Sequence, residues 1–259
     1  MCTMMMKRDL LVAAKTVDTP KTLLTFAYKP TGVNRYGFLY FKMGWQKGVN
    51  SGINESGLAV LSSYAGTKLP KSENQDTRGL ANELALSRCR TVQEGLHTLE
   101  TFFTEQPSGV GGTHFLMDAE GGMAVFEHEP HLSTKGQLIQ SDYMIRANES
   151  LLLQDEEMRL IEWEDRRLRY TQAEMGIKEM SGATWLEEMK KLLSTHLPND
   201  QQQIGSLCIH DFENKGSRSK DLSVHSTETA LIIDIKNRRL IYSDGPPCHN
   251  QWAALTFNH

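Results

Sequence analysis

Short apolar runs on either side of polar turns recur along the chain and predict antiparallel hairpins. Three such pairs stand out, with the turns at residues 7–9, 118–122 and 236–238. The flanking runs are residues 3–6 and 10–17, 113–117 and 123–127, and 230–235 and 239–243. Runs of this length that are rich in apolar residues and bounded by turn residues are typical of strands. We therefore expect three hairpins, spread over the whole chain.

Helical patterns lie between these hairpins. Residues 78–87 favour a helix, and Thr91 followed by Glu94 is a capping-box pattern that predicts the start of a second one. After Thr91, apolar residues recur at helical spacing, at Val92, Leu96, Leu99 and Phe103. Both helices are therefore expected before the second hairpin.

Two further helices are expected before the last hairpin. Residues 155–175 form a charged, amphipathic segment whose apolar side is expected to carry Met158, Ile161, Leu168 and Met175. Thr184 and Glu187 form a second capping-box pattern, which opens a helix that runs towards His196.

The order of these elements predicts the fold class. Hairpins and helices are segregated along the chain, which favours α+β layers with antiparallel sheets over a parallel nucleotide-binding sheet. No GxGxxG or P-loop pattern is present, so no nucleotide cofactor is expected. No internal repeat or low-complexity linker divides the sequence, and we expect residues 1–259 to form a single domain.

Composition excludes several classes of protein. The 259 residues carry a formal net charge of −4, with acidic and basic residues mixed along the chain, which argues against nucleic acid as a partner. No apolar run approaches the ~18 residues that a membrane span requires. Lys7, Arg8 and Asp9 interrupt any signal-peptide core near the start. A cytoplasmic enzyme with no membrane partner is the expectation.

The four cysteines are widely spaced. Cys2, Cys89, Cys208 and Cys248 form no CxxC pair and match no zinc-binding spacing, so free thiols and no metal are expected. Cys208 and His210 lie two residues apart, but the sequence offers no third group to orient them, and they are interpreted as core residues.

Cys2 is the strongest candidate nucleophile. Removal of Met1 would leave a chain that starts with a thiol and a free α-amine on one residue, and such a residue can supply both nucleophile and base. In a hairpin that turns at residues 7–9, paired positions sum to roughly 16–18, which brings Lys15 and Asp18 near Cys2. A cation there favours the thiolate, and a carboxylate can hold the amine.

The sequence resembles a known group of enzymes at this point. Its start, Met1-Cys2-Thr3 followed by Lys15-Thr16-Val17-Asp18, is similar to the start of the choloylglycine hydrolase and penicillin V acylase family. It also resembles the penicillin-biosynthesis acyltransferase family, in which processing exposes the nucleophilic cysteine. Further segments that resemble these families follow in the same order, at residues 52–58, 113–121, 147–148, 165–170, 206–210 and 245–248. The resemblance implies a four-layer αββα N-terminal-nucleophile (Ntn) hydrolase sandwich with two antiparallel sheets.

The resemblance also implies roles for individual residues. Cys2 would attack the amide carbonyl, and Asp18 would interact with the amine and thiol of Cys2. The side-chain NH2 of Asn148 and the backbone N–H of Asn54 would stabilise the oxyanion. Lys15 stands where these families usually have arginine, and it keeps the charge but not the bidentate geometry.

The second arginine of these families falls in the run from Asp165 to Arg169. Arg166 is the first choice for this position, and Arg167 and Arg169 stay open. The alternative, non-functional interpretation of this run is a solvent-exposed helix face.

Three functions fit these residues. The first is a cysteine amidohydrolase that cleaves a linear amide, and the second is an acyltransferase that passes the acyl group to an amine. The third is a non-catalytic binding protein on the same scaffold. A small-molecule amide or acyl substrate and no cofactor are expected, and the resemblance is compatible with a homo-oligomer. Candidates to line an acyl pocket are Met4, Met6, Phe26, Trp45 and Tyr64, with core packing as the alternative.

Overall fold

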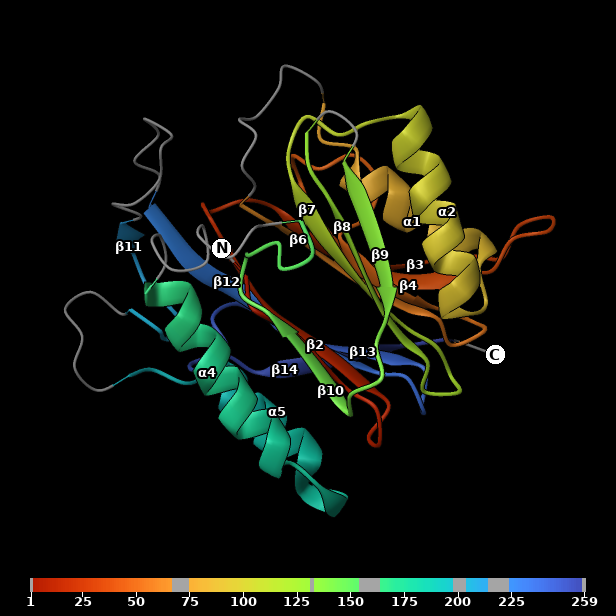
Figure 1. Cartoon of the computed structure of the whole chain (residues 1–259). Helices are drawn as coiled ribbons and strands as arrows, with labels where there is room; N and C mark the ends of the chain where they lie inside the picture. The colour runs from red at the N-terminus through yellow and green to blue at the C-terminus, as the bar shows by residue number, and fades with distance from the viewer. Residues whose placement is uncertain are drawn as a thin grey trace.

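Two antiparallel sheets stacked face to face, with helices on their outer faces, make up the computed structural model of the chain (Figure 1). The structure describes residues 2–66, 75–130, 133–153, 164–197, 204–213 and 224–257. None of the helices described in these ranges is long and apolar enough to cross a membrane.

The first sheet, sheet A, contains the start and the end of the chain. Its strands lie in the order β10-β1-β2-β12-β13-β14, and β11 pairs with β12. The bounds are β1 (Met4–Lys7), β2 (Val12–Thr19), β10 (Tyr143–Arg146), β11 (Phe212–Glu213), β12 (Val224–Asp234), β13 (Arg239–Ser243) and β14 (Trp252–Thr256). The central position of β1 and β2 explains why every residue of β2 and every residue of β1 is buried.

Sheet B is a meander in which each strand pairs with the next in the sequence, from β3 to β9. The bounds are β3 (Leu24–Lys29), β4 (Phe38–Met43), β5 (Ser51–Asn54), β6 (Ala59–Tyr64), β7 (Gly112–Met117), β8 (Met123–His128) and β9 (Thr134–Leu138).

The helices cover the outer faces of the sheets. Helices α1 (Arg78–Arg88) and α2 (Val92–Glu105) pack on sheet B, and α4 (Glu164–Glu179) and α5 (Trp185–Leu193) pack on sheet A. A short 3₁₀ helix, η1 (Gly182–Thr184), leads into α5. Three apolar clusters fill the spaces between the four layers, one between the sheets and one beneath each helix pair. The expected αββα sandwich is confirmed.

All three predicted hairpins are confirmed, as β1–β2, β7–β8 and β12–β13. In the first hairpin Met4 pairs with Lys15, so paired positions sum to 19 instead of 16–18. The longer turn between β1 and β2 causes this shift, and it includes Leu11 at a positive φ of 48°.

Helix α2 begins as predicted. The Thr91 side chain accepts a hydrogen bond from the Glu94 backbone N–H at 3.2 Å, and the Glu94 side chain accepts from the Thr91 backbone. The second predicted capping box is wrong, because η1 precedes α5 and the Thr184 side chain makes no capping bond. Thr184 Oγ1 donates instead to the Glu188 carboxylate at 2.7 Å.

The predicted apolar side of the 155–175 segment is also wrong where the structure describes it. Met175 is 61% exposed, and the buried residues of α4 are Arg166, Arg169, Ala173 and Ile177. Residues 155–163 lie outside the described ranges. Two buried arginines on one helix have a high desolvation cost, which indicates that this face serves a site.

The two threonines at these helix starts offer a direct test. Replacing Thr91 by alanine is expected to lower the free energy of unfolding by about 1 kcal/mol, because it removes a capping bond. Replacing Thr184 by alanine is expected to change it by less than about 0.5 kcal/mol, since only an exposed side-chain contact is lost. Urea denaturation of both variants checks this pair. Equal losses would show that both threonines cap their helices.

Candidate active site

Cys2 is held at the edge of β1, in line with sheet A. Its backbone nitrogen donates to Asn148 Oδ1 at 2.6 Å. The next residue, Thr3, continues the ladder, because Thr16 N–H donates to the Thr3 carbonyl at 3.0 Å. Side chains alternate along a strand, and Met4 packs between the sheets, so Cys2 faces the space between the sheets too. The start of the chain is therefore fixed in place.

Lys15 lies on β2 with its side chain fully buried between the two sheets. Its ammonium group donates to Asn50 Oδ1 at 2.7 Å and to the Ser62 carbonyl at 2.6 Å, so a side chain of sheet A is bonded to sheet B. Burial lowers the pKa of Lys15, and an ionised Cys2 thiol opposes this shift. No carboxylate of the described chain pairs directly with Lys15, and its charge is thus available to stabilise a Cys2 thiolate.

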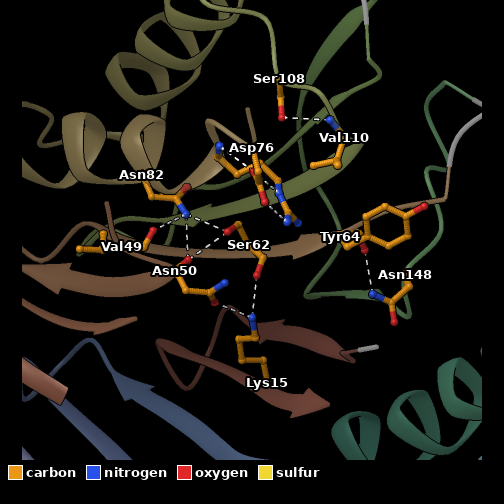
Figure 2. A network of polar contacts seen from close by, with 11 residues as sticks. Lys15, Val49, Asn50, Ser62, Tyr64, Asp76, Asn82, Ser108, Val110 and Asn148 are labelled. Atoms are coloured by element: carbon orange, nitrogen blue, oxygen red, sulfur yellow. Dashed lines mark hydrogen bonds and ion pairs between the residues drawn. The ribbon is translucent and has the colours of Figure 1, made fainter. Parts of the chain in front are cut away.

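A second layer of amides holds the acceptors of Lys15 in position (Figure 2). Asn82 of α1 donates to the Asn50 carbonyl at 2.8 Å and to Ser62 Oγ at 2.8 Å. Its own Oδ1 contacts His114 Nδ1 at 2.7 Å. Burial lowers the pKa of His114 to about 3, so this histidine is neutral. The network is connected from helix α1 through sheet B to Lys15.

Asp18 is buried on the opposite face of sheet A from Lys15. Three positions separate the two residues on β2, and an odd separation places side chains on opposite faces. Thr227 Oγ1 of β12 donates to Asp18 Oδ1 at 2.7 Å. Burial raises the pKa of Asp18, and the nearby Arg169 opposes this shift. Lys15 and Asp18 therefore approach Cys2 from the two sides of the sheet.

Asn148 follows β10 in a turn with a positive φ of 72°, a region that asparagine tolerates better than most residues. Its Nδ2 donates to the Tyr64 carbonyl at 2.7 Å, while its Oδ1 accepts from Cys2. The Glu127 carboxylate stabilises this turn, because it accepts hydrogen bonds from Ser150 Oγ and from the Leu152 N–H. The asparagine is thus fixed between β1 and β6.

The structure brings two of the three candidate arginines to this site. Arg169 donates to Thr3 Oγ1 at 2.9 Å and lies 3.4 Å from Asn148 Oδ1, and Asp165 pairs with it at 2.9 Å. Arg166, the first choice from the sequence, is buried over Gly66, where a Cβ atom would come within 2.7 Å of its guanidinium. Arg167 is exposed. Arg169 is therefore the arginine that contacts the segment of Cys2 and Thr3.

The structure does not bring Asn54 to the site. Its backbone N–H donates to the Leu58 carbonyl at 3.0 Å, and its Nδ2 donates to the Leu86 and Cys89 carbonyls at the end of α1. Asn54 lies beside the Ala59 end of β6, and five residues at the rise of a strand place the Tyr64 end about 17 Å away. The expected oxyanion role of Asn54 is contradicted by this geometry.

The main chain of Tyr64 is a part of the site that the sequence did not reveal. Ala65 N–H donates to the carbonyl of Gly111, the residue just before β7, and backbone groups alternate in direction along an antiparallel strand. Tyr64 and Ser62 therefore direct their backbone groups to the other edge of β6, where their carbonyls meet Asn148 and Lys15. The Tyr64 N–H points to this same edge.

Of the candidate acyl-pocket residues, Met4 and Met6 belong to the apolar cluster between the sheets, Phe26 packs against it, and Tyr64 is 39% exposed. Met4 and Met6 are fully buried between the sheets, and Trp45 is exposed. Phe26 stacks on Tyr242 with a centroid distance of 3.8 Å and lines a pocket at the ends of β3 and β13.

Comparison with known proteins decides the family. A family model described as acyl-coenzyme A:6-aminopenicillanic acid acyl-transferase matches residues 10–223. The chain belongs to this family. Its members are acyltransferases and related hydrolases of linear amides, so the protein is an enzyme of this class. No curated protein sequence matches the chain at a significant level.

Solved structures support the Ntn-hydrolase fold. Penicillin V acylase from Agrobacterium tumefaciens is 16% identical, with a TM-score of 0.60 over 99% of this chain and 86% of that one. A variant of conjugated bile acid hydrolase from Clostridium perfringens is 9% identical, with a TM-score of 0.55 over 100% and 97%. An N-acylethanolamine-hydrolyzing acid amidase ortholog from Caenorhabditis elegans is 8% identical, with a TM-score of 0.53 over 91% and 93%.

The charge of Lys15 should control the reactivity of Cys2. Replacing Lys15 by methionine is expected to slow alkylation of Cys2 by iodoacetamide at neutral pH at least about tenfold, because the nearby cation stabilises the thiolate. Peptide mass mapping against time measures the rate.

Lys7 supplies a matched control for this variant. Its ammonium group is also buried, and it donates to the carbonyls of Ile177, in the last turn of α4, and of Met180, just after the helix. Replacing Lys7 by methionine also leaves buried acceptors without a donor, yet it should not change the rate at Cys2. Equal slowing in both variants would show an effect of folding and not of charge.

The buried carboxylate of Asp18 should cost stability at neutral pH. Because burial raises its pKa above 3.8, the stability that the proton confers is present below that pH and lost as the pH rises through the folded-state pKa. Replacing Asp18 by asparagine is therefore expected to raise the free energy of unfolding at pH 7, with a difference that shrinks towards pH 3.8. Urea denaturation across this range measures the difference.

Asp118 provides the contrast for this experiment. Its carboxylate accepts backbone hydrogen bonds from Val92 at 3.0 Å and Gly122 at 2.9 Å. Asp118→Asn should lower the free energy of unfolding at pH 7. A loss of stability in Asp18→Asn would contradict the expected cost of its burial.

Proposed function

We propose that the protein is a cysteine amidohydrolase that cleaves a linear, non-peptide amide through an acyl-enzyme on Cys2, after removal of Met1. The observation that carries this proposal is the hydrogen bond between the Cys2 nitrogen and Asn148 Oδ1, beside the buried charge of Lys15. A bond at this nitrogen would orient a free α-amine next to the thiol. One residue then supplies the nucleophile and the proton carrier.

In this mechanism the thiolate of Cys2 attacks the amide carbonyl. The thiol proton passes to the α-amine of Cys2, which then protonates the departing amine. A carboxylate beside a cationic amine favours its charged form, so Asp18 would support the amine at this stage. Lys15 stabilises the thiolate before the attack.

The oxyanion of the tetrahedral intermediate needs preorganised donors. The donors proposed for this role lie at the edge of β6: the backbone N–H of Tyr64, which points to this edge, and the second N–H of Asn148 Nδ2. The first N–H of this amide is bonded to the Tyr64 carbonyl, which fixes the direction of the second. Arg169 holds both Thr3 and Asn148 and so positions the nucleophile against these donors.

Acyl transfer is the second candidate function, because the matching family model describes an acyltransferase. Both reactions share the acyl-enzyme and differ only in whether water or an amine attacks it. Protein incubated with a panel of fatty-acyl and aryl-acetyl amides, with and without acceptor amines, separates them. Release of free acid supports hydrolysis, and formation of a new amide supports transfer.

The nucleophile itself is tested by three variants. Cys2→Ala is expected to abolish turnover and the acyl-enzyme mass adduct, and Asn148→Ala to lower kcat by ~10²–10³-fold through loss of an oxyanion donor. Cys89→Ser is the control, since the Cys89 thiol is buried against Thr98 and should leave turnover intact. Intact mass also shows whether Met1 is removed. Full turnover by Cys2→Ala would refute the mechanism. Wild-type protein that turns over none of the amides would instead favour the non-catalytic binding protein.

A further inference from the structure

Four potential metal ligands converge at one end of sheet A, from three separate segments of the chain. They are His196, which follows α5, Cys208 and His210, which precede β11, and Cys248, in the loop between β13 and β14. One ligating atom from each residue lies within 4.8 Å of the other three. The sequence did not reveal this cluster. Cys208 and His210 were interpreted as core residues with no third partner, and Cys248 lies 38 residues after His210.

The distances between these atoms match a tetrahedral site. The two thiol sulfurs of Cys208 and Cys248 are 3.5 Å apart. His210 Nε2 lies 3.8 Å from the Cys208 sulfur and 3.2 Å from the Cys248 sulfur. A tetrahedron built with the usual Zn–S and Zn–N bond lengths places its corners roughly 3.4–3.8 Å apart. The Cys208–Cys248 and Cys208–His210 distances fall in or at the edge of this range, the His210–Cys248 distance is slightly shorter, and the His196 ligand atom lies within 4.8 Å of the other three.

Backbone hydrogen bonds preorganise the segments that carry the ligands. The N–H groups of Leu207 and Cys208 both donate to the Thr195 carbonyl at 3.1 Å, which holds the Cys208 segment beside His196. The loop of Cys248 is closed by Asn250, whose backbone and side chain both donate to the Pro246 carbonyl. The cluster is therefore a built feature of the fold and not a chance meeting of flexible side chains.

We propose that His196, Cys208, His210 and Cys248 bind one Zn²⁺ ion. Two thiolates and two imidazoles are a donor set that selects zinc among the common divalent ions. Four protein ligands fill a tetrahedral shell, so the ion is structural and does not carry a reactive water.

The position of this site gives it a consequence for the active site. Ile209, between two of the ligands, is bonded twice to Thr227, through its N–H to Thr227 Oγ1 at 2.9 Å and through its carbonyl to the Thr227 N–H at 2.8 Å. The same Thr227 hydroxyl donates to Asp18. Zinc would therefore hold Ile209, which lies next to Cys208 and His210 in the sequence, and through it Thr227, whose hydroxyl orients Asp18.

The test is the metal content of protein without an affinity tag, after dialysis against metal-free buffer. Wild-type protein is expected to keep one zinc per chain, as measured by inductively coupled plasma mass spectrometry. Cys248→Ser and His196→Ala are expected to lose most of it. Cys89→Ser and His249→Ala are the controls, since Cys89 lies under α2 and His249 is not one of the four ligands.

Substitution with Co²⁺ provides a second reading that does not depend on variants that fold. Thiolate-to-cobalt charge-transfer bands and the intense visible bands of tetrahedral cobalt are expected in wild-type protein and in both controls. Wild-type protein that takes up neither metal would overturn the proposal. So would a Cys208–Cys248 disulfide in freshly purified, non-reduced protein, or a loss of zinc in His249→Ala equal to that in His196→Ala.

Zinc content and turnover are independent readouts, and the proposal does not require the amidase assignment. If it holds, removal of zinc by a chelator should lower the melting temperature, because the ion binds the folded state in preference to the unfolded chain. Retention of the same melting temperature after complete zinc removal would contradict a structural role.

Discussion

The ammonium group of Lys15 is the interaction on which the active site depends. It lies between the two sheets, where the alternative to hydrogen bonding is a large desolvation cost, and it meets two neutral oxygens instead of a carboxylate. A paired carboxylate would satisfy the charge locally. Neutral acceptors leave its charge uncompensated near Cys2, and this arrangement would suit the thiolate nucleophile proposed above. The second layer around Asn82 exists to keep these oxygens in place.

The remaining charges of the site are also buried at some cost to stability. Asp18 lies on the opposite face of sheet A, and Arg169 reaches it from helix α4 while it holds Thr3 and Asn148. Burial disfavours the ionised form of Asp18, and the arginine offsets only part of this effect. Helix α4 thus buries charge where an ordinary amphipathic helix buries apolar side chains. The cost is consistent with a site that is organised for chemistry.

Local patterns predicted most of the fold, and long-range contacts decided most of the site. The hairpins and the Thr91 capping box depend on residues close in sequence, and both could be predicted. The sequence left the register of Arg166, Arg167 and Arg169 open, and Arg169 contacts Thr3, because only the packing of α4 on sheet A sets the register. The oxyanion role expected for Asn54 also depended on a long-range position that the sequence does not show. The side-chain amide of Asn54 donates to the carbonyls at the end of α1 instead.

The presence of lysine at position 15 follows from the size of its surroundings. The enzymes that the sequence resembles usually have an arginine there, whose planar fork prefers a carboxylate or several acceptors in one plane. Asn50 Oδ1 and the Ser62 carbonyl instead approach a single atom at 2.7 and 2.6 Å. A compact ammonium donates to both and still has a third N–H. The departure from the family pattern is therefore a change of geometry that keeps the charge, and it is consistent with a working site.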